Sequence, residues 1–122
     1  MGKTLVFGVS LKPNRYSNLA VHRLVENKME TEAFGLESGE LSGVQVKTKL
    51  NDIQNIDTVT LYLNPKRQRG YYQQIIDLRP RRVIFNPGTE NPEFYTLLKI
   101  QGIAVEVACT LVLLATGQYH RN

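Results

Sequence analysis

The chain has 122 residues, of which 42% are hydrophobic and 21% are charged, and its formal net charge is +4. This size and composition are typical of one globular domain, which we expect to span residues 1–122. The single cysteine, Cys109, excludes an internal disulfide and a zinc cage made of cysteines. No secretory signal is evident and no apolar stretch reaches membrane length, so we expect a cytoplasmic protein that does not contact a membrane.

The first half of the chain begins with a strand pattern and continues with a helical one. The apolar run TLVFGV, residues 4–9, predicts a strand buried on both faces. Ala20, Val21 and Leu24 then recur at helical spacing, with Ser17 as the expected N-cap and a helix end near Asn27. Short strands are expected at residues 31–36 and 44–48, with a loop, ESGELSG, between them.

The second half repeats one pattern, in which an apolar strand is followed by an Asn-Pro pair and a helix. Asparagine is a good N-cap and proline suits the first helical position, so helices should begin at Asn64-Pro65 and Asn91-Pro92. The first of these should extend to Arg79, and Gly102 should cap the second. The expected strands are residues 57–63, 82–87 and 103–107, and a buried helix over 108–116 should close the chain.

Alternating strands and helices of this kind predict an α/β fold. We expect a single Rossmann-like domain with a parallel sheet of about five strands and helices on both faces. Ligands of such sheets bind beyond the carboxyl ends of the strands, so the turns from strand to helix are the places to examine.

The first such turn carries the groups of an anion site. Gly8 permits a tight turn, and Val9, Ser10, Arg15, Ser17 and Asn18 follow at the start of the first helix. Hydroxyl, amide and guanidinium groups would join the positive end of that helix, and arginine can bind phosphate oxygens in pairs. A polar loop with a serine N-cap is the structural alternative.

The other two turns are less specific. Leu63, Asn64 and Pro65 form the second, for which helix capping is a sufficient explanation. The third, FNPGTEN, contains Asn86, Pro87 and Gly88 and is longer than a cap requires. Binding and architecture explain it equally well.

A tight NAD-binding turn is disfavoured because the dinucleotide fingerprint needs three glycines and this loop has one. Glu37 is the nearest acid that could meet a ribose, but its place in a loop suggests simple solvation. We find no catalytic set and no metal-ligand spacing: His22 lies within a helix, His120 lies in the tail, and Cys109 precedes an apolar helix. Six basic residues between Lys66 and Arg82 suggest a solvated surface, or less plausibly a nucleic-acid site.

Taken together, GVSLKPNRYSN, DTVTLYLNP, RVIFNPGTEN and ACTLVLLATGQY resemble the small stand-alone CoA-binding proteins. This Rossmann-like family is similar to the CoA-binding domain of the succinyl-CoA ligase alpha subunit. The resemblance covers nearly the whole chain and implies that the pyrophosphate of CoA lies over the first turn. The phosphate contacts it implies are Gly8, Val9, Ser10, Arg15, Ser17 and Asn18.

The resemblance also places Leu63, Asn64 and Pro65 beside the pantetheine arm or nucleotide, and Asn86, Pro87 and Gly88 along the same edge. A cation near the adenosine end would suit the ribose 3′-phosphate of CoA, and Lys12 and Lys47 are the two candidates, which the sequence does not place. Ligase chemistry is not implied, because the second domain with its phosphorylated histidine is missing.

The sequence thus predicts a module that binds CoA or an acyl-CoA without catalysis, and an NAD(P)-binding enzyme or redox-sensing domain is the alternative. The partner expected is a small nucleotide ligand rather than a nucleic acid. An apolar last helix with Tyr71 and Tyr72 would also allow a homodimer.

Overall fold

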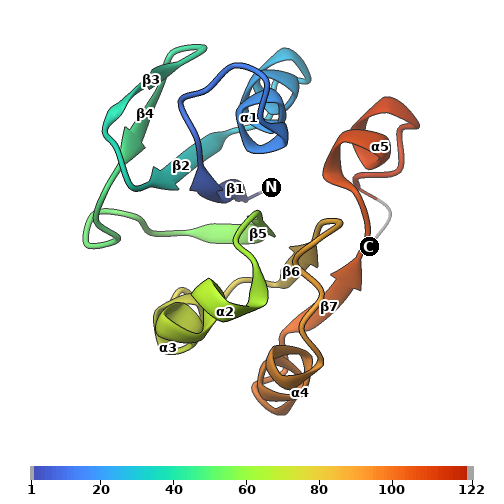
Figure 1. Cartoon of the computed structure of the whole chain (residues 1–122). Coiled ribbons are helices and arrows are strands. Elements are labelled where there is room, and N and C mark those ends of the chain that lie inside the picture. The colour runs from blue at the N-terminus through green and yellow to red at the C-terminus, as the bar shows by residue number, and fades with distance from the viewer. Residues whose placement is uncertain (1, 121–122) are drawn as a thin grey trace.

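A computed structural model describes residues 2–120 as one seven-stranded sheet with helices on both faces (Figure 1). The strands are β1 (Lys3–Val9), β2 (Thr31–Gly35), β3 (Gly39–Leu41), β4 (Val44–Lys47), β5 (Ile56–Leu61), β6 (Arg82–Phe85) and β7 (Ala104–Val107). The helices are α1 (Tyr16–Glu26), α2 (Pro65–Gln68), the 3-10 turn η1 (Arg69–Tyr71), α3 (Tyr72–Asp77), α4 (Pro92–Ile100) and α5 (Thr110–Ala115). The predicted Rossmann-like α/β fold is confirmed.

The strand order is β3-β4-β2-β1-β5-β6-β7, and every neighbouring pair is parallel except β3 and β4. The sheet therefore has more strands than the expected five, and β3 lies within a stretch expected to be a loop. Ser42 and Gly43 join β3 to β4 with φ angles of 53° and 83°. Two successive positive φ angles are typical of the two-residue turn that favours a hairpin, which explains why this polar stretch pairs.

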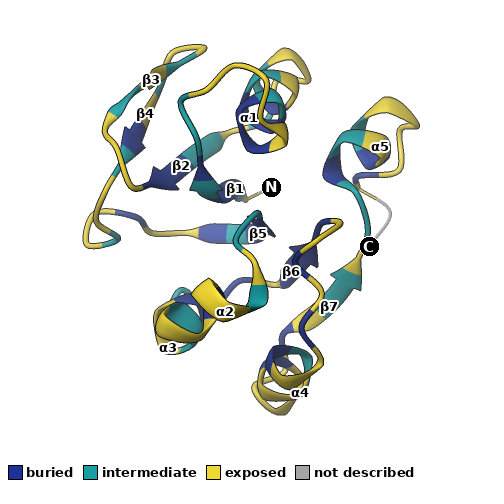
Figure 2. Ribbon diagram, in the orientation of Figure 1, coloured by how far each residue is buried: buried dark blue, intermediate teal, exposed yellow. Residues whose placement is uncertain are grey.

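The core has two halves because successive side chains of a strand point to opposite faces. On β1, Leu5 and Phe7 face the half beneath α3 and α4, and Val6 and Val9 face the half beneath α1 and α5. Figure 2 shows the middle strands buried and the outward surfaces of the helices exposed. The continuous apolar run of β1 is buried because both faces of this strand are covered.

Three helix predictions change in detail. The N-cap of helix α1 is Arg15, two residues before the expected Ser17. The helix expected from Pro65 to Arg79 is divided into α2, η1 and α3, with the poor helix former Gly70 in the 3-10 turn. The closing helix is only half buried, since Val112 is 56% exposed. No helix within residues 2–120 combines the length and the apolar character needed to cross a bilayer.

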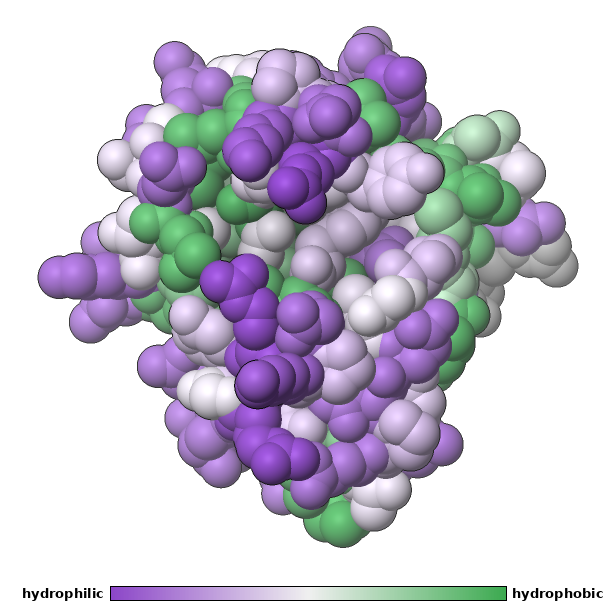
Figure 3. Space-filling view, in the orientation of Figure 1, coloured by the Kyte–Doolittle hydropathy of each residue, from purple (hydrophilic) through white to green (hydrophobic). Residues whose placement is uncertain are grey.

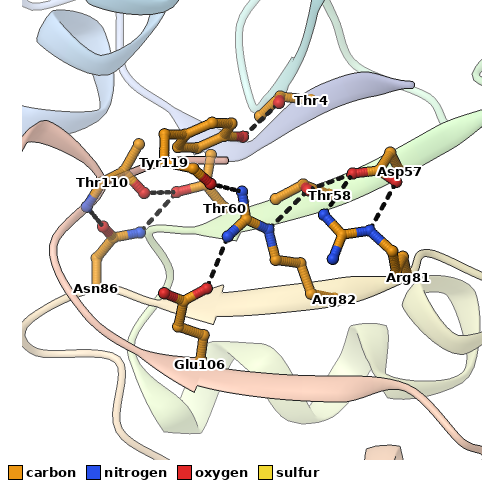
Figure 4. A network of polar contacts seen from close by, with 10 residues as sticks. All are labelled: Thr4, Asp57, Thr58, Thr60, Arg81, Arg82, Asn86, Glu106, Thr110 and Tyr119. Carbon is orange, nitrogen blue, oxygen red and sulfur yellow. Dashed lines mark hydrogen bonds and ion pairs between the residues drawn. The ribbon is translucent and has the colours of Figure 1, made fainter. Parts of the chain in front are cut away.

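Arg82 anchors the C-terminal segment to the sheet (Figure 4). The side chain is buried, and its guanidinium donates to Thr58 Oγ1 at 3.0 Å, Glu106 Oε1 at 2.7 Å and the Tyr119 carbonyl at 2.7 Å. The guanidinium also lies 4.5 Å from the centre of the Tyr119 ring, whose hydroxyl bonds Thr4 Oγ1. Arg82 is therefore an internal tie and does not contribute to a basic surface.

Candidate functional site

A cleft of about 470 Å³ opens at the carboxyl ends of the central strands. Its walls come from the end of β1 and the loop before α1, the end of β2, the end of β5, the α2–η1 segment and Pro87. The chain leaves β1 toward β2 on one side and later returns to β5 on the other. Such a reversal of strand order is where open α/β sheets bind their ligands. In the region between α1 and α2, Figure 3 shows hydrophilic side chains around a hollow.

Gly8 shapes the floor of this cleft. Its φ is +99°, and a Cβ there would lie 2.8 Å from Leu63 Cδ2 and 3.0 Å from Leu63 Cγ. Any other residue would be strained in its backbone and crowded against the end of β5. The missing side chain leaves the turn open to the cleft, and phosphate binding at this turn stays a prediction.

Hydrogen bonds fix the loop that follows. The Ser10 amide donates to Ser17 Oγ at 3.0 Å, and Asn18 Nδ2 donates to the Ser10 carbonyl at 3.0 Å. The Lys12 amide donates to Ser10 Oγ at 3.2 Å. Ser17 and Asn18 are buried, so they hold the loop against α1. Arg15 and Lys12 remain exposed at its rim.

The N-terminus of α1 is electrostatically unbalanced. Arg15 at the N-cap offers no side-chain acceptor to the first turn, and that turn contains no acidic residue. The first N–H groups of a helix normally need such an acceptor, and a cation there opposes the positive end of the helix dipole. A bound anion would accept from these N–H groups and pair with Arg15 at once, so this arrangement favours phosphate.

The opposite wall is apolar and aromatic. Phe34 and Tyr71 meet edge to face with ring centres 5.6 Å apart, and Leu36 beside them is 71% exposed. Arg67, on α2, adds a third cation to those of Lys12 and Arg15. An apolar and aromatic wall next to cations suits a ligand that combines a ring with phosphates.

Seven of the twelve predicted site residues line this cleft: Gly8, Val9, Ser10, Arg15, Ser17, Leu63 and Pro87. The other five lie outside its lining: Asn18, Asn64, Pro65, Asn86 and Gly88. Asn64 caps α2 by accepting from the Arg67 amide at 2.9 Å. The roles of these residues toward a ligand stay predictions.

Asn86, directly after β6, is buried, and its side chain connects the end of β5 to the start of α5. Its Nδ2 donates to Thr60 Oγ1 at 2.7 Å and to the Leu61 carbonyl at 2.9 Å. Its Oδ1 accepts from the Thr110 amide at 2.8 Å (Figure 4). The side chain is 1% exposed, so these three bonds satisfy it within the protein.

Sequence reasoning overlooked part of the lining. Leu36, Arg67 and Tyr71 were not considered for the site, and Glu37 was taken as solvated. Because ligands of such sheets lie at the carboxyl ends of the central strands, the position of Leu36 and Glu37 after β2 indicates that they line the site. Arg67 and Tyr71 reach the cleft through the split between α2 and α3, which periodicity did not reveal.

Tyr62 and Cys109 are two further groups of interest near the carboxyl ends of the strands. Burial raises the pKa of Tyr62, whose hydroxyl has no hydrogen-bond partner within the described residues. Cys109 is half-buried at the start of α5. Within residues 2–120, His, Cys, Asp and Glu side chains form no group that could hold a metal ion.

Three of the six basic residues between Lys66 and Arg82 pair with acids or lie inside the protein. Arg81 pairs with Asp57, Arg69 pairs with Glu93, and Arg82 is buried. The hydrogen bond and charge of Arg81 lower the pKa of Asp57 although burial opposes this.

A mostly parallel sheet with a cleft at the point where its strand order reverses defines the class of the protein as a Rossmann-like domain, and domains of this class bind their ligands at that point. Comparison with known families matches residues 2–115 to the CoA binding domain. The chain belongs to this CoA-binding family, as its motifs predicted.

Solved structures share the fold over nearly the full chain. One, described as an uncharacterized protein, is 43% identical, covers 98% of each chain and has a TM-score of 0.93. A hypothetical protein from Pyrococcus horikoshii OT3 is 26% identical, with 91% of this chain and 80% of that chain covered and a TM-score of 0.81. A Thermus thermophilus protein at 24% identity covers 97% and 91%, with a TM-score of 0.83. No curated protein matches the chain.

Proposed function

We propose that the protein binds CoA or an acyl-CoA through the turn between β1 and α1, as a binding module without catalysis of its own. The observation that carries this proposal is the N-terminus of α1, beside the open turn at Gly8. Its N-cap residue, Arg15, supplies no side-chain acceptor to the first N–H groups of the helix. Helix N–H groups and two nearby cations are suited to a pyrophosphate. Membership of the CoA-binding family supports CoA as the ligand that contains this pyrophosphate.

The remaining walls suit the other parts of CoA. Leu63 and Pro87 give an apolar border for the pantetheine arm, and Leu36 with Tyr71 gives a surface for the adenine ring. Among the described residues that line the cleft there is one carboxylate and no histidine or cysteine. This composition favours binding over acid–base or nucleophilic chemistry.

The proposal is tested by identifying the ligand. Purified protein is denatured and searched for released CoA by mass spectrometry, and thermal shifts are measured with CoA, acetyl-CoA, NAD and NADP. A ligand that binds only the native state raises the unfolding temperature, so CoA or its thioester should stabilise. Stabilisation by NAD or NADP without CoA would contradict the proposal and favour the dinucleotide alternative.

Arg15→Ala should weaken CoA binding by roughly 1.5–3 kcal/mol, the scale of a hydrogen bond to a charged group. Arg23→Ala is the matched control, since Arg23 lies on the same helix outside the cleft and pairs with Glu26. Equal affinities of the two variants would remove Arg15 from the site. A homodimer stays a prediction that light scattering in solution would test, although Tyr71 and Tyr72 pack on Phe34 and Phe94 of their own chain.

A further inference from the structure

Glu37 is the one acidic side chain among the residues that line the cleft. It lies two residues beyond Gly35, the end of β2. Gly35 is pressed against the first turn, because a Cβ there would lie 2.4 Å from the Val9 carbonyl oxygen. Glu37 follows this contact by two residues and lines the cleft, and its exposed carboxylate has no hydrogen bond or ion pair within residues 2–120.

The net positive charge of the cleft lining balances the two negative charges of a pyrophosphate but not those of a further phosphate. Lys12, Arg15 and Arg67 with Glu37 give the lining a net charge of +2. A pyrophosphate diester carries about two negative charges, one on each phosphate. A ribose 3′-phosphate would add about −1.5 to −2 at neutral pH. The three cations among the described residues that line the cleft do not balance that additional charge.

Lys47 does not supply the missing charge. Its Nζ lies 3.2 Å from Glu32 Oε1, and Lys3 lies 3.2 Å from the other oxygen of the same carboxylate. Lys47 is not among the residues that line the cleft. Of the two predicted 3′-phosphate contacts, Lys12 alone is among the residues that line the cleft, where it is also one of the three cations counted against the pyrophosphate.

A carboxylate after the second strand is suited to a ribose with free hydroxyls. In Rossmann-like sheets the base and ribose extend from the first turn toward this strand end, where an acid accepts hydrogen bonds from the ribose. The same carboxylate repels a phosphate attached to that ribose. We propose that Glu37 makes the cleft select an adenosine diphosphate ester whose ribose 3′-hydroxyl is unphosphorylated, with 3′-dephospho-CoA favoured over CoA.

This inference rests on the proposed function, because it assumes that the first turn holds the pyrophosphate of a CoA-type ligand. The test is calorimetric titration of the full chain with CoA and with 3′-dephospho-CoA. We expect 3′-dephospho-CoA to bind about fivefold more tightly, the effect of one screened charge contact. Glu37→Gln should remove the difference by improving CoA, and Glu37→Lys should reverse it.

Glu40→Gln is the matched control, since Glu40 is an exposed acid on the adjacent β3 that does not line the cleft. It should keep the preference of the unmodified protein. Equal or tighter binding of CoA by the unmodified protein would overturn the inference and leave the proposed function intact. An unchanged preference in Glu37→Gln would overturn it as well. If neither compound bound, the proposed function itself would fail.

Discussion

Gln68 holds together the two turns that border the cleft on the β5 and β6 side. The side chain is fully buried, and its Nε2 donates to the carbonyls of Leu63 and Thr89, both at 2.8 Å. Its Oε1 accepts from Asn91 Nδ2 at 2.9 Å. Leu63 lines the cleft, so a loss of these bonds should affect both stability and binding.

Gln68→Leu keeps a side chain of similar size and removes all three bonds. Asn91 retains a bond with the Tyr72 hydroxyl at 2.8 Å, so the main loss is two buried carbonyls without a donor. Each unsatisfied buried group costs about 1–3 kcal/mol, which predicts a total of about 2–6 kcal/mol. Urea denaturation followed by circular dichroism measures this difference in the free energy of unfolding.

Gln73→Leu is the control, because Gln73 is exposed and bonds only Asp77 one helical turn away at 2.8 Å. Surface changes of this kind usually alter stability by less than about 0.5 kcal/mol. If Gln68→Leu cost no more than Gln73→Leu, the hydrogen-bonded turns would not be the element that stabilises this side of the cleft.

Three further variants test other parts of the account. Gly8→Ala should cost about 1–2 kcal/mol because of its positive φ and should weaken CoA binding by crowding Leu63; unchanged affinity in calorimetry would argue against a ligand at this turn. Arg82→Met should destabilise by about 3–5 kcal/mol in urea, since it leaves a partly buried Glu106 unpaired, and a loss below about 1 kcal/mol would refute the anchoring role. Asp57→Asn should lower the melting temperature at pH 7. The pKa of Asp57 in the folded protein lies below its ordinary value of 3.8. The carboxylate therefore stabilises the folded state fully above pH 3.8, and this stabilisation is lost as the pH falls through the folded-state pKa. The two melting curves should therefore converge in acid, and a constant difference would contradict the ion pair with Arg81.

The buried strands were predictable because their apolar runs are continuous. β1, β5 and β6 stand in the middle of the sheet with both faces covered, and burial of this kind leaves a clear sequence pattern. The asparagine caps at Asn64 and Asn91 were predictable for a local reason, since each side chain accepts from an amide three residues later.

The hairpin and part of the cleft were not predictable in the same way. β3 is three residues long at the edge of the sheet and gains its pairing from the turn at Ser42 and Gly43 rather than from apolar content. Glu37 and Arg67 are exposed charges, whose sequence pattern does not differ from that of solvated loops. Their common position at the cleft arises from the crossovers, which bring the ends of distant strands to one edge.

Titration of CoA into the purified full chain, followed by calorimetry, tests the central claim most directly. We expect saturable binding of CoA at one site per chain. Added salt and the Arg15→Ala substitution should each weaken this binding, because cations at the first turn bind the pyrophosphate. Absence of saturable binding by CoA, its thioesters and 3′-dephospho-CoA, with NAD binding instead, would contradict it.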